Sequence, residues 1–326
     1  MKENEVINLS KQCNFNANQA LPLKLEASGR EYWRVINDND SLVLCYLDPS
    51  KGDHSDFIKI TNSLKKNNVN SVDILYHNAD LGVTLQQDLG DNDLLTILGG
   101  DNKLELLKGS LDLLIKIQNA NIEDIERFSE NELEQQMNLF KDVFCLEFLN
   151  INADKSIDDL ISITIDHLNK QPWVNCHFDF ERRNLILSRD LIKVIDYQDM
   201  KIGPIGIDLS GILIDHYYEV NFENIHDLLG YFSEQVGLKY SGEELFEFLR
   251  LGCIQRNMRI LGTLTDLYIK HKRSFRLKDL PMILLNLTSM IPENHASREF
   301  ILQETESLLI KAAPFSPKVT ISSQVI

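Results

Sequence analysis

The sequence lacks the motifs that mark several common enzyme classes. It contains no GxxxxGK[ST] and no GxGxxG stretch, so P-loop and Rossmann nucleotide sites lose their main support. It also contains no GxSxG and no HExxH, which argues against an α/β-hydrolase and against a helical zinc peptidase. Any nucleotide or nucleophile chemistry in this chain must therefore use another arrangement of residues.

Cysteines and long apolar runs are also scarce. The five cysteines are odd in number, lie far apart and form no CxxC pair, which argues against a disulfide framework or a structural zinc site. No apolar run approaches the roughly 20 residues that span a bilayer. The first twenty residues are polar and lack the apolar core of a secretory signal. We therefore expect a cytoplasmic protein without a membrane partner and with reduced, buried thiols.

Positive charge is in deficit, and the formal net charge is −16. A chain this acidic repels nucleic acid phosphates, so we expect a small-molecule substrate and no nucleic acid partner. If the ligand is a nucleotide, a metal ion and local cations must hold its phosphates inside a negative protein. The acidity is equally consistent with a role in solubility alone.

The first ninety residues read mostly as strands. Their patterns predict strands at residues 21–27, 31–37, 42–47, 72–76 and 82–86, with one helix at residues 56–67. The first two strands form a hairpin around a turn at residues 28–30. This segment is therefore expected to be a small, mostly β lobe.

After residue 88 the pattern becomes helical. Helices are predicted at residues 94–98, 104–118, 130–149 and 157–168, short strands at 185–187 and 193–195, and more helices from 207 onward. Turns are expected at residues 203–204 and 237, and a loosely attached tail at 314–326. The prediction is an α+β fold with two lobes, residues 1–87 and 88–326, joined by a hinge at residues 87–90 beside a ligand cleft.

The stretch from His177 onward carries the chemistry. Asp179 and Asn184 lie five residues apart in a loop, and Asp196 stands just after the second of the two short strands that follow. Phosphoryl transfer to an alcohol needs a carboxylate to orient or deprotonate the hydroxyl, a task that suits Asp179. It also needs hard oxygen ligands for Mg²⁺, which Asn184 and Asp196 can supply.

The residues around this loop resemble a known superfamily. The chain is similar to the aminoglycoside phosphotransferases and choline kinases, and within them to the bacterial anomeric kinases of N-acetylmuramate and N-acetylglucosamine. The resemblance is carried by VIDYQDMKIGPIGIDLSGILID, SGREYWRV, LQQDLGDNDLLTIL, MNLFKD, IQRNMRILGTL and LKDLP. It extends over residues 21–292.

The resemblance implies a protein-kinase-like fold that uses ATP and Mg²⁺ to phosphorylate the anomeric hydroxyl of an amino sugar during cell-wall recycling. It assigns Asp179 as the base and Asn184 and Asp196 as the metal ligands. The implied nucleotide contacts are Ser28, Gly29 and Arg30 in the hairpin and Gln87 and Leu89 in the hinge. Asp215 and Arg256 are implied sugar contacts, and His177 and Asp208 are expected to support the loop.

Several positions depart from the family pattern, namely Phe178, Glu181, Ile207, Gln136 and Val143. The changes on the acceptor side leave the exact sugar open.

Protein kinases also carry a phosphate-binding lysine on their third strand, and residues 42–47 contain none. Its replacement is Lys24, Arg30, Arg34 or Mg²⁺ alone. Two other functions remain open as well: a kinase of an aminoglycoside, choline or another hydroxyl acceptor, and an inactive nucleotide-binding regulator.

Overall fold

The structure is a computed structural model that describes residues 1–23, 29–98, 103–214, 216–218 and 220–303. The chain forms two compact units. The first comprises Met1–Ile125 with Arg182–Met200, and the second Glu126–Glu181 with Lys201–Ile326. The lobe boundaries at residues 1–87 and 88–326 stay a prediction.

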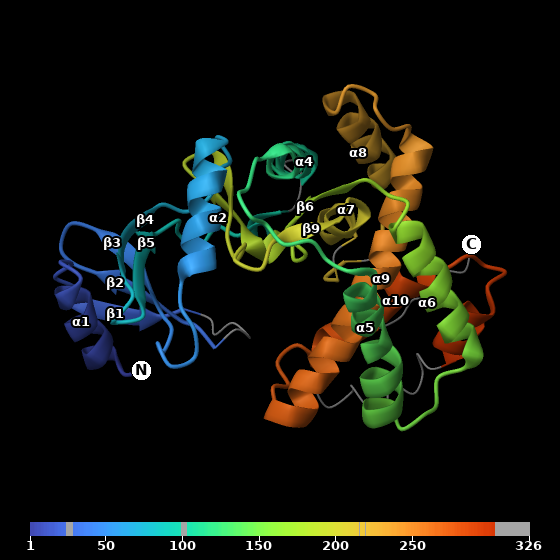
Figure 1. Cartoon of the computed structure of the whole chain (residues 1–326), viewed down its shortest axis with the longest axis horizontal. Coiled ribbons are helices and arrows are strands. Elements are labelled where there is room, and N and C mark those ends of the chain that lie inside the picture. Colours follow the sequence, from blue (N-terminus) through green and yellow to red (C-terminus); the bar gives the residue numbers. More distant parts are fainter. Residues whose placement is uncertain (24–28, 99–102, 215, 219, 304–326) are drawn as a thin grey trace. The chain divides into compact units, whose positions relative to one another are not determined.

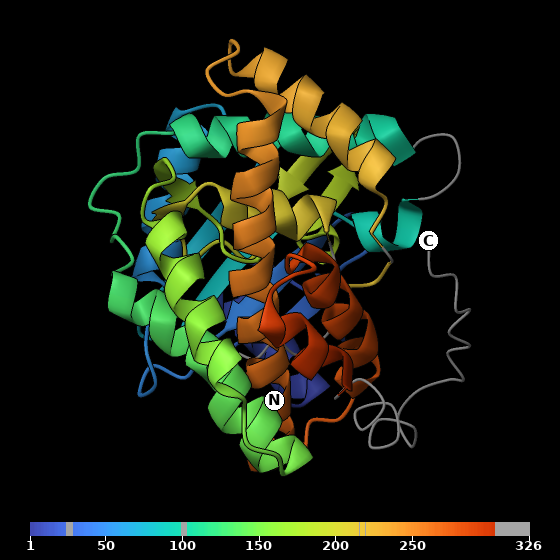
Figure 2. The same cartoon turned by 90° about the vertical axis from the view of Figure 1, so that its right-hand side faces the viewer.

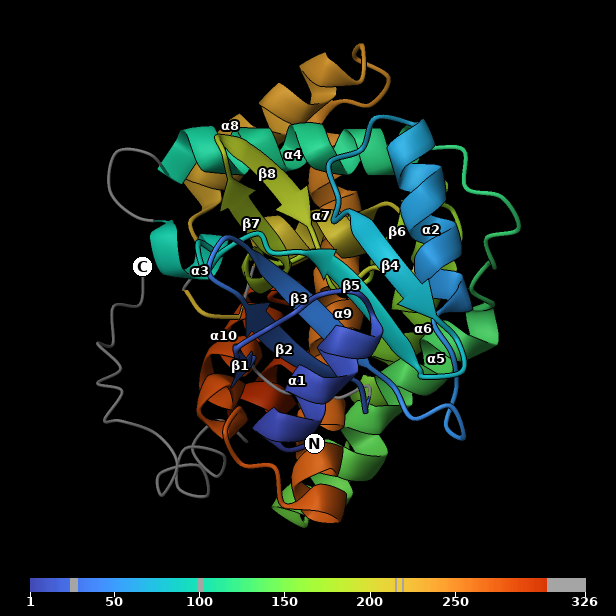
Figure 3. The ribbon, with the colours of Figure 1, turned by 90° about the vertical axis from the view of Figure 1, so that its left-hand side faces the viewer.

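A five-stranded antiparallel sheet is the main feature of the first unit. Its strands are β1 (Gln19–Pro22), β2 (Glu31–Ile36), β3 (Ser41–Tyr46), β4 (Ile74–Asn78) and β5 (Val83–Gln87). Their order across the sheet is β1-β2-β3-β5-β4 (Figure 3). The predicted hairpin between the first two strands is confirmed, because Ala20 pairs with Val35 in antiparallel register.

Two helices cover this sheet. Helix α1 (Glu3–Gln12) packs against β1 and β2 and buries Val6 completely. Helix α2 (Ser55–Lys66) lies beside β4 and β5 (Figure 1) and buries Phe57, Ile60 and Leu64, the three residues whose spacing predicted it. Helix α1 was not predicted. Only Val6 and Ser10 of this helix are buried, so its sequence lacks the apolar stripe by which a helix is recognised.

The first unit also contains the segment that carries two of the predicted site residues. The helical turn η3 (Arg182–Asn184) leads into a hairpin of β7 (Leu185–Ser188) and β8 (Leu191–Val194). Helix α4 (Lys103–Asn119) lies across this hairpin, and the short helix α3 (Leu94–Ile97) contacts η3 and β7 (Figure 3).

The second unit is mostly helical and is built around one long helix. Helix α9 (Gly242–His271) packs against α5 (Glu130–Leu139), α6 (Lys155–Leu168), α7 (Gly206–Leu213), α8 (Phe222–Gln235), α10 (Leu280–Met290) and the π-helix η2 (Phe140–Leu149) (Figure 2). Strands β6 (Trp173–Cys176) and β9 (Lys201–Pro204) pair next to α7. A helical turn, η4 (Leu277–Asp279), precedes α10.

One local prediction is wrong. Residues 203–204 are the end of strand β9 rather than a turn, because Gly203 and Pro204 pair with Val174 and Trp173. The predicted helix at residues 130–149 is confirmed, and its geometry becomes π-helical at Phe140, where Phe140, Phe144 and Phe148 form a stacked row. The tail at residues 314–326 lies outside the described residues.

The structure bears on two further expectations, the state of the cysteines and the presence of membrane-spanning helices. Each of the five cysteines is a buried thiol, as predicted. Within the described ranges, the helices include none long and apolar enough to cross a membrane.

Candidate active site

The first unit contains a cavity of about 600 Å³, a size typical of small-molecule sites. Gln87 and Leu89 of the predicted hinge line it, as does Val43 of β3. Asn184 and Asp196 line it as well, so the structure brings together the two predicted metal ligands and the two predicted hinge contacts. Apolar walls with a few polar groups are what a nucleotide base and its phosphates require.

The β7–β8 hairpin sets the spacing of Asn184 and Asp196. Leu185 pairs with Val194, and the backbone N–H of Ile195 donates to the carbonyl of Asn184 at 3.0 Å. Asp196 follows directly, in the left-handed region at φ 61°. Aspartate tolerates this conformation better than most residues, since its short side chain can hydrogen-bond locally.

Tyr197, the residue that follows Asp196, is anchored through its side chain. Its side chain is fully buried, stacks on Phe57 of α2 at 5.3 Å between ring centroids, and shares a 2.8 Å hydrogen bond with the hydroxyl of Thr61. Burial raises the pKa of Tyr197 well above its ordinary value, so the hydroxyl is neutral. Helix α2 therefore fixes the backbone on one side of Asp196.

The carboxylate of Asp196 is left without a compensating cation in the described part of the chain. It accepts a 2.8 Å hydrogen bond from the Gln198 amide, which also donates to Asp199 at 3.2 Å. An amide oxygen from Asn184 and an uncompensated carboxylate are hard donors that fit Mg²⁺. Among the described residues, no group of three or more acidic, His or Cys side chains could hold a metal ion by itself, so these two ligands would share the ion with a bound phosphate.

The candidate replacements for the missing lysine differ in their contacts. Arg34 is held by the carboxylates of Asp88 at 2.7 Å and Asp91 at 2.8 Å, and these bonds raise its pKa. The Nε atom of Arg30 is buried and has no hydrogen-bond partner. Lys24 and Ser28 lie outside the described residues, and Gly29 adopts the left-handed φ of 76° expected in a turn.

In the second unit, a buried carboxylate, Asp208, organises the loop that carries Asp179. Asp208 accepts hydrogen bonds from the backbone N–H groups of His177 at 2.6 Å and Phe178 at 2.8 Å. Burial raises the pKa of Asp208 above its ordinary value, although these hydrogen bonds act in the opposite direction. The ring of His177 accepts from the N–H of Asp179 at 3.3 Å, so both predicted supporting residues contact the loop.

Asp179 also contacts a residue that sequence reasoning missed. The guanidinium of Arg259 on α9 donates to its Oδ1 at 2.9 Å and to the carbonyl of Phe178 at 3.0 Å. The sequence held one signal for this residue. Arg259 stands three positions after Arg256 on the same helix, which places both on one face.

Arg256 belongs to a buried ion-pair cluster. It donates to Glu181 at 2.7 Å, the His216 ring lies 3.3 Å from the same carboxylate, and Arg256 and Glu181 are 1% and 2% exposed. This pairing explains why a glutamate can occupy position 181, where it would otherwise be an unpaired buried charge. Arg256 as a sugar contact stays a prediction, and Asp215 lies outside the described residues.

Comparison with known proteins identifies the family. The model of the phosphotransferase enzyme family, the aminoglycoside phosphotransferase type, matches residues 19–230. The chain belongs to this phosphotransferase family. Its relatives include the N-acetylmuramate/N-acetylglucosamine kinases of Pseudomonas aeruginosa, 26% identical over 84% of each chain, and of Neisseria meningitidis, 27% identical over 79% of this chain and 81% of the relative. The predicted resemblance is confirmed.

Solved structures support the same fold at lower identity. The choline kinase of Streptococcus pneumoniae has a TM-score of 0.63 at 11% identity, covering 88% of this chain and 99% of that one. A spectinomycin phosphotransferase solved with ADP and spectinomycin has a TM-score of 0.59 at 15% identity, covering 94% and 99%. The predicted α+β, protein-kinase-like fold and the phosphotransferase class are therefore confirmed.

Proposed function

We propose that this phosphotransferase is an ATP-dependent kinase that phosphorylates the anomeric hydroxyl of N-acetylmuramate or N-acetylglucosamine. The observation that carries the kinase proposal is the cavity in which the hinge, Asn184 and the uncompensated carboxylate of Asp196 come together. The choice of sugar is supported by relatives of that name, which are 25–27% identical over about four-fifths of the chain.

In the proposed reaction, Asp179 accepts the proton of the anomeric hydroxyl. The hydroxyl oxygen forms a bond to the γ-phosphorus, the bond from that phosphorus to the β–γ bridging oxygen breaks, and ADP leaves. Asn184 and Asp196 would hold Mg²⁺, which neutralises charge on the phosphates when it is bound. A hemiacetal hydroxyl is more acidic than an ordinary alcohol, so a carboxylate is a sufficient base.

Arg30 is the proposed cation for the nucleotide phosphates. Arg34 is already held by two carboxylates, whereas the Nε of Arg30 is buried without a hydrogen-bond partner. We expect Arg30→Ala to raise the KM for ATP about tenfold, since a charge-assisted hydrogen bond contributes about 1.5–3 kcal/mol. Initial rates at varied ATP measure this, and an unchanged KM would remove Arg30 from the site.

Charge at Asp179 favours a sugar over a cationic acceptor. The Asp179 carboxylate is paired with Arg259 at 2.9 Å, so an aminoglycoside or choline would place its positive charge near a guanidinium. Like charges at close range disfavour binding. N-acetylglucosamine is neutral and N-acetylmuramate carries a carboxylate, so neither meets this repulsion.

An acceptor panel tests the proposal. Purified protein with ATP and Mg²⁺ is given N-acetylmuramate, N-acetylglucosamine, choline or an aminoglycoside, and NMR locates the phosphorylated carbon. Transfer to C1 of an amino sugar is expected. Turnover only with the cationic acceptors would replace the proposed substrate, and ATP binding without transfer to any acceptor would indicate an inactive regulator.

A further inference from the structure

The residue before Asp179 has an unusual backbone conformation. Phe178 lies in the left-handed region at φ 66°, which is rare for a bulky side chain and is maintained only when its surroundings enforce it. Its ring packs against Phe128 at 4.2 Å between centroids. A Cβ added at Gly203 would come within 2.6 Å of the ring, so a side chain at this position would force the ring to move. The loop is thus built around a strained residue.

Both peptide groups that flank this residue are held by charged side chains. The N–H of Phe178 donates to Asp208 at 2.8 Å, and its carbonyl accepts from Arg259 at 3.0 Å. The same nitrogen of Arg259 donates to Asp179 Oδ1 at 2.9 Å. One guanidinium therefore fixes both the strained backbone and the carboxylate that follows it.

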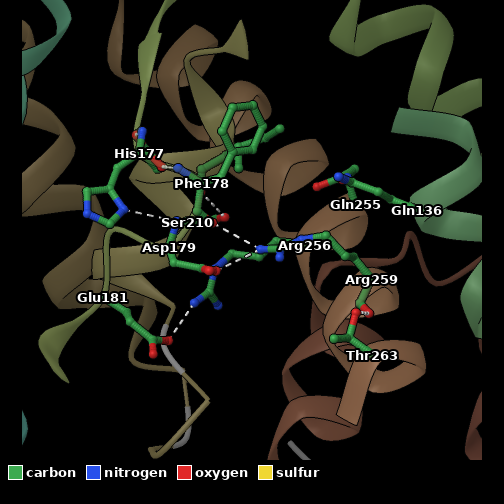
Figure 4. Close-up of polar contacts among 12 residues, drawn as sticks. Gln136, His177, Phe178, Asp179, Glu181, Ser210, Gln255, Arg256, Arg259 and Thr263 are labelled. Atoms are coloured by element: carbon green, nitrogen blue, oxygen red, sulfur yellow. Dashed lines mark hydrogen bonds and ion pairs between the residues drawn. The ribbon is translucent and has the colours of Figure 1, made fainter. Parts of the chain in front are cut away.

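The two arginines of α9 contact the loop in different ways (Figure 4). Arg256 and its partner Glu181 are almost fully buried, at 1% and 2% exposed, which is the setting of an internal structural pair. Arg259 is 15% exposed, and its partner Asp179 is 49% exposed. An acceptor can reach the second pair but not the first. This contrast separates a residue that acts on the chemistry from one that only stabilises the loop.

We propose that Arg259 is a positioning residue for phosphoryl transfer. It holds the plane of the Asp179 carboxylate and prevents the Phe178 peptide from relaxing out of its left-handed conformation. The inference rests on the proposed function, because it assumes that Asp179 orients the acceptor hydroxyl. A planar guanidinium can hold a carboxylate and a neighbouring carbonyl together, which a lysine ammonium does less well.

The test compares Arg259→Gln and Arg259→Lys with the matched control Arg250→Gln. Arg250 is on the same helix and also binds one carboxylate, Glu247 at 2.7 Å, and one carbonyl, that of Met290 at 3.2 Å. For Arg259→Gln we expect kcat to fall about 100-fold while the KM for ATP stays within twofold, the scale of a misplaced catalytic group. Arg259→Lys should regain part of this rate, and Arg250→Gln should keep it.

Amide hydrogen exchange of residues 177–181 is measured on the same three variants and needs no turnover. Faster exchange in Arg259→Gln but not in Arg250→Gln is expected. A kcat within threefold of wild type in Arg259→Gln would overturn the proposal, as would equal losses in both glutamine variants. If the wild type turns over no acceptor, the proposed function fails by itself. In that case the exchange still tests whether Arg259 holds the loop: unchanged exchange would overturn that part of the proposal, and selective loosening would support it.

Discussion

Asp196 in the first unit and Asp179 in the second are both carboxylates in short loops, but different charges surround them. Asp196 contacts the neutral amide of Gln198 at 2.8 Å, and the described residues give it no cationic partner. Asp179 is paired with the guanidinium of Arg259 at 2.9 Å. One negative charge is therefore left uncompensated, whereas the other is balanced by the protein itself.

The contacts that hold the backbone next to these two carboxylates differ in the same way, neutral beside Asp196 and charged beside Asp179. Beside Asp196 the anchor is a neutral hydrogen bond between Tyr197 and Thr61. Around Asp179 the loop is held by the buried carboxylate of Asp208 and by ion pairs from α9. A group that binds a metal ion must keep its own charge available, whereas a group that accepts a proton from a hydroxyl must also be held in a fixed direction. The contrast supports different tasks for the two carboxylates.

The largest expected effect comes from Asp196→Asn, which removes the uncompensated charge. We expect kcat to fall by about 10³-fold or more, since a bound metal supplies several kcal/mol of charge stabilisation, and Mg²⁺-dependent ATP binding to be lost. Calorimetric titration of ATP with and without Mg²⁺ measures the binding. The control Asp199→Asn changes the exposed carboxylate nearby, and equal losses in both variants would argue against Asp196 as the specific ligand.

The second effect sharpens the contrast. Asp179→Asn preserves the shape of the side chain and should lower kcat by about 10²–10³-fold, the usual range for a lost acid–base group. ATP binding should be unchanged, because in the proposed reaction Asp179 acts on the acceptor hydroxyl and does not contact the nucleotide. If Asp179→Asn weakened nucleotide binding as strongly as Asp196→Asn, the division of tasks between the two carboxylates would be wrong.

The third effect, on stability, comes from the ion pair between Asp88 and Arg34. Burial raises the pKa of Asp88, but hydrogen bonds from Ser41 and Arg34 lower it, and the net pKa lies below the ordinary value. A carboxylate with a lowered pKa stabilises the fold above its unfolded-state pKa, and this contribution is lost as pH falls through the folded pKa. We expect Asp88→Asn to lower the free energy of unfolding by about 1–3 kcal/mol at neutral pH.

Urea unfolding at pH 7 and at an acidic pH below the lowered pKa of folded Asp88 measures this difference, which should shrink at the acidic pH because wild-type Asp88 is then protonated. Asp91→Asn is the matched control. Its carboxylate pairs with the same arginine but is 78% exposed, so the effect should be small. A difference for Asp88→Asn that is the same at both pH values would contradict the assignment.

The sequence was sufficient where the site is local. Asn184 and Asp196 are set by a hairpin of two short strands, and the pattern of residues 185–195 predicted that hairpin directly. Gln87 and Leu89, which the sequence singled out near a change of pattern at residue 88, line the cavity, whereas the hinge itself stays a prediction. Features that depend on neighbours along the chain can be inferred from the order of residues alone.

Sequence reasoning failed where the contact is distant. Arg259 and Asp179 are 80 residues apart, and nothing in either segment specifies the packing of α9 against the loop. Strand β9 was read as a turn because its Gly-Pro ending is a turn signal, and its partner β6 has only four residues. Tertiary pairing overrides local propensity in both cases.

The smallest expected effect tests the neutral anchor beside Asp196. Tyr197→Phe should lower the free energy of unfolding by about 1 kcal/mol, the usual net contribution of a hydrogen bond, and should leave kcat within about threefold. A double-mutant cycle with Thr61→Val isolates the pair, because each hydroxyl is the other's partner at 2.8 Å. A coupling energy near zero would mean that the hydrogen bond to Thr61 does not help to hold Tyr197.

Salt separates this neutral anchor from the ion pair at the other carboxylate. Stacking and a neutral hydrogen bond are insensitive to salt, so added salt should leave the coupling between Tyr197 and Thr61 unchanged. The same salt should weaken the half-exposed pair of Arg259 with Asp179.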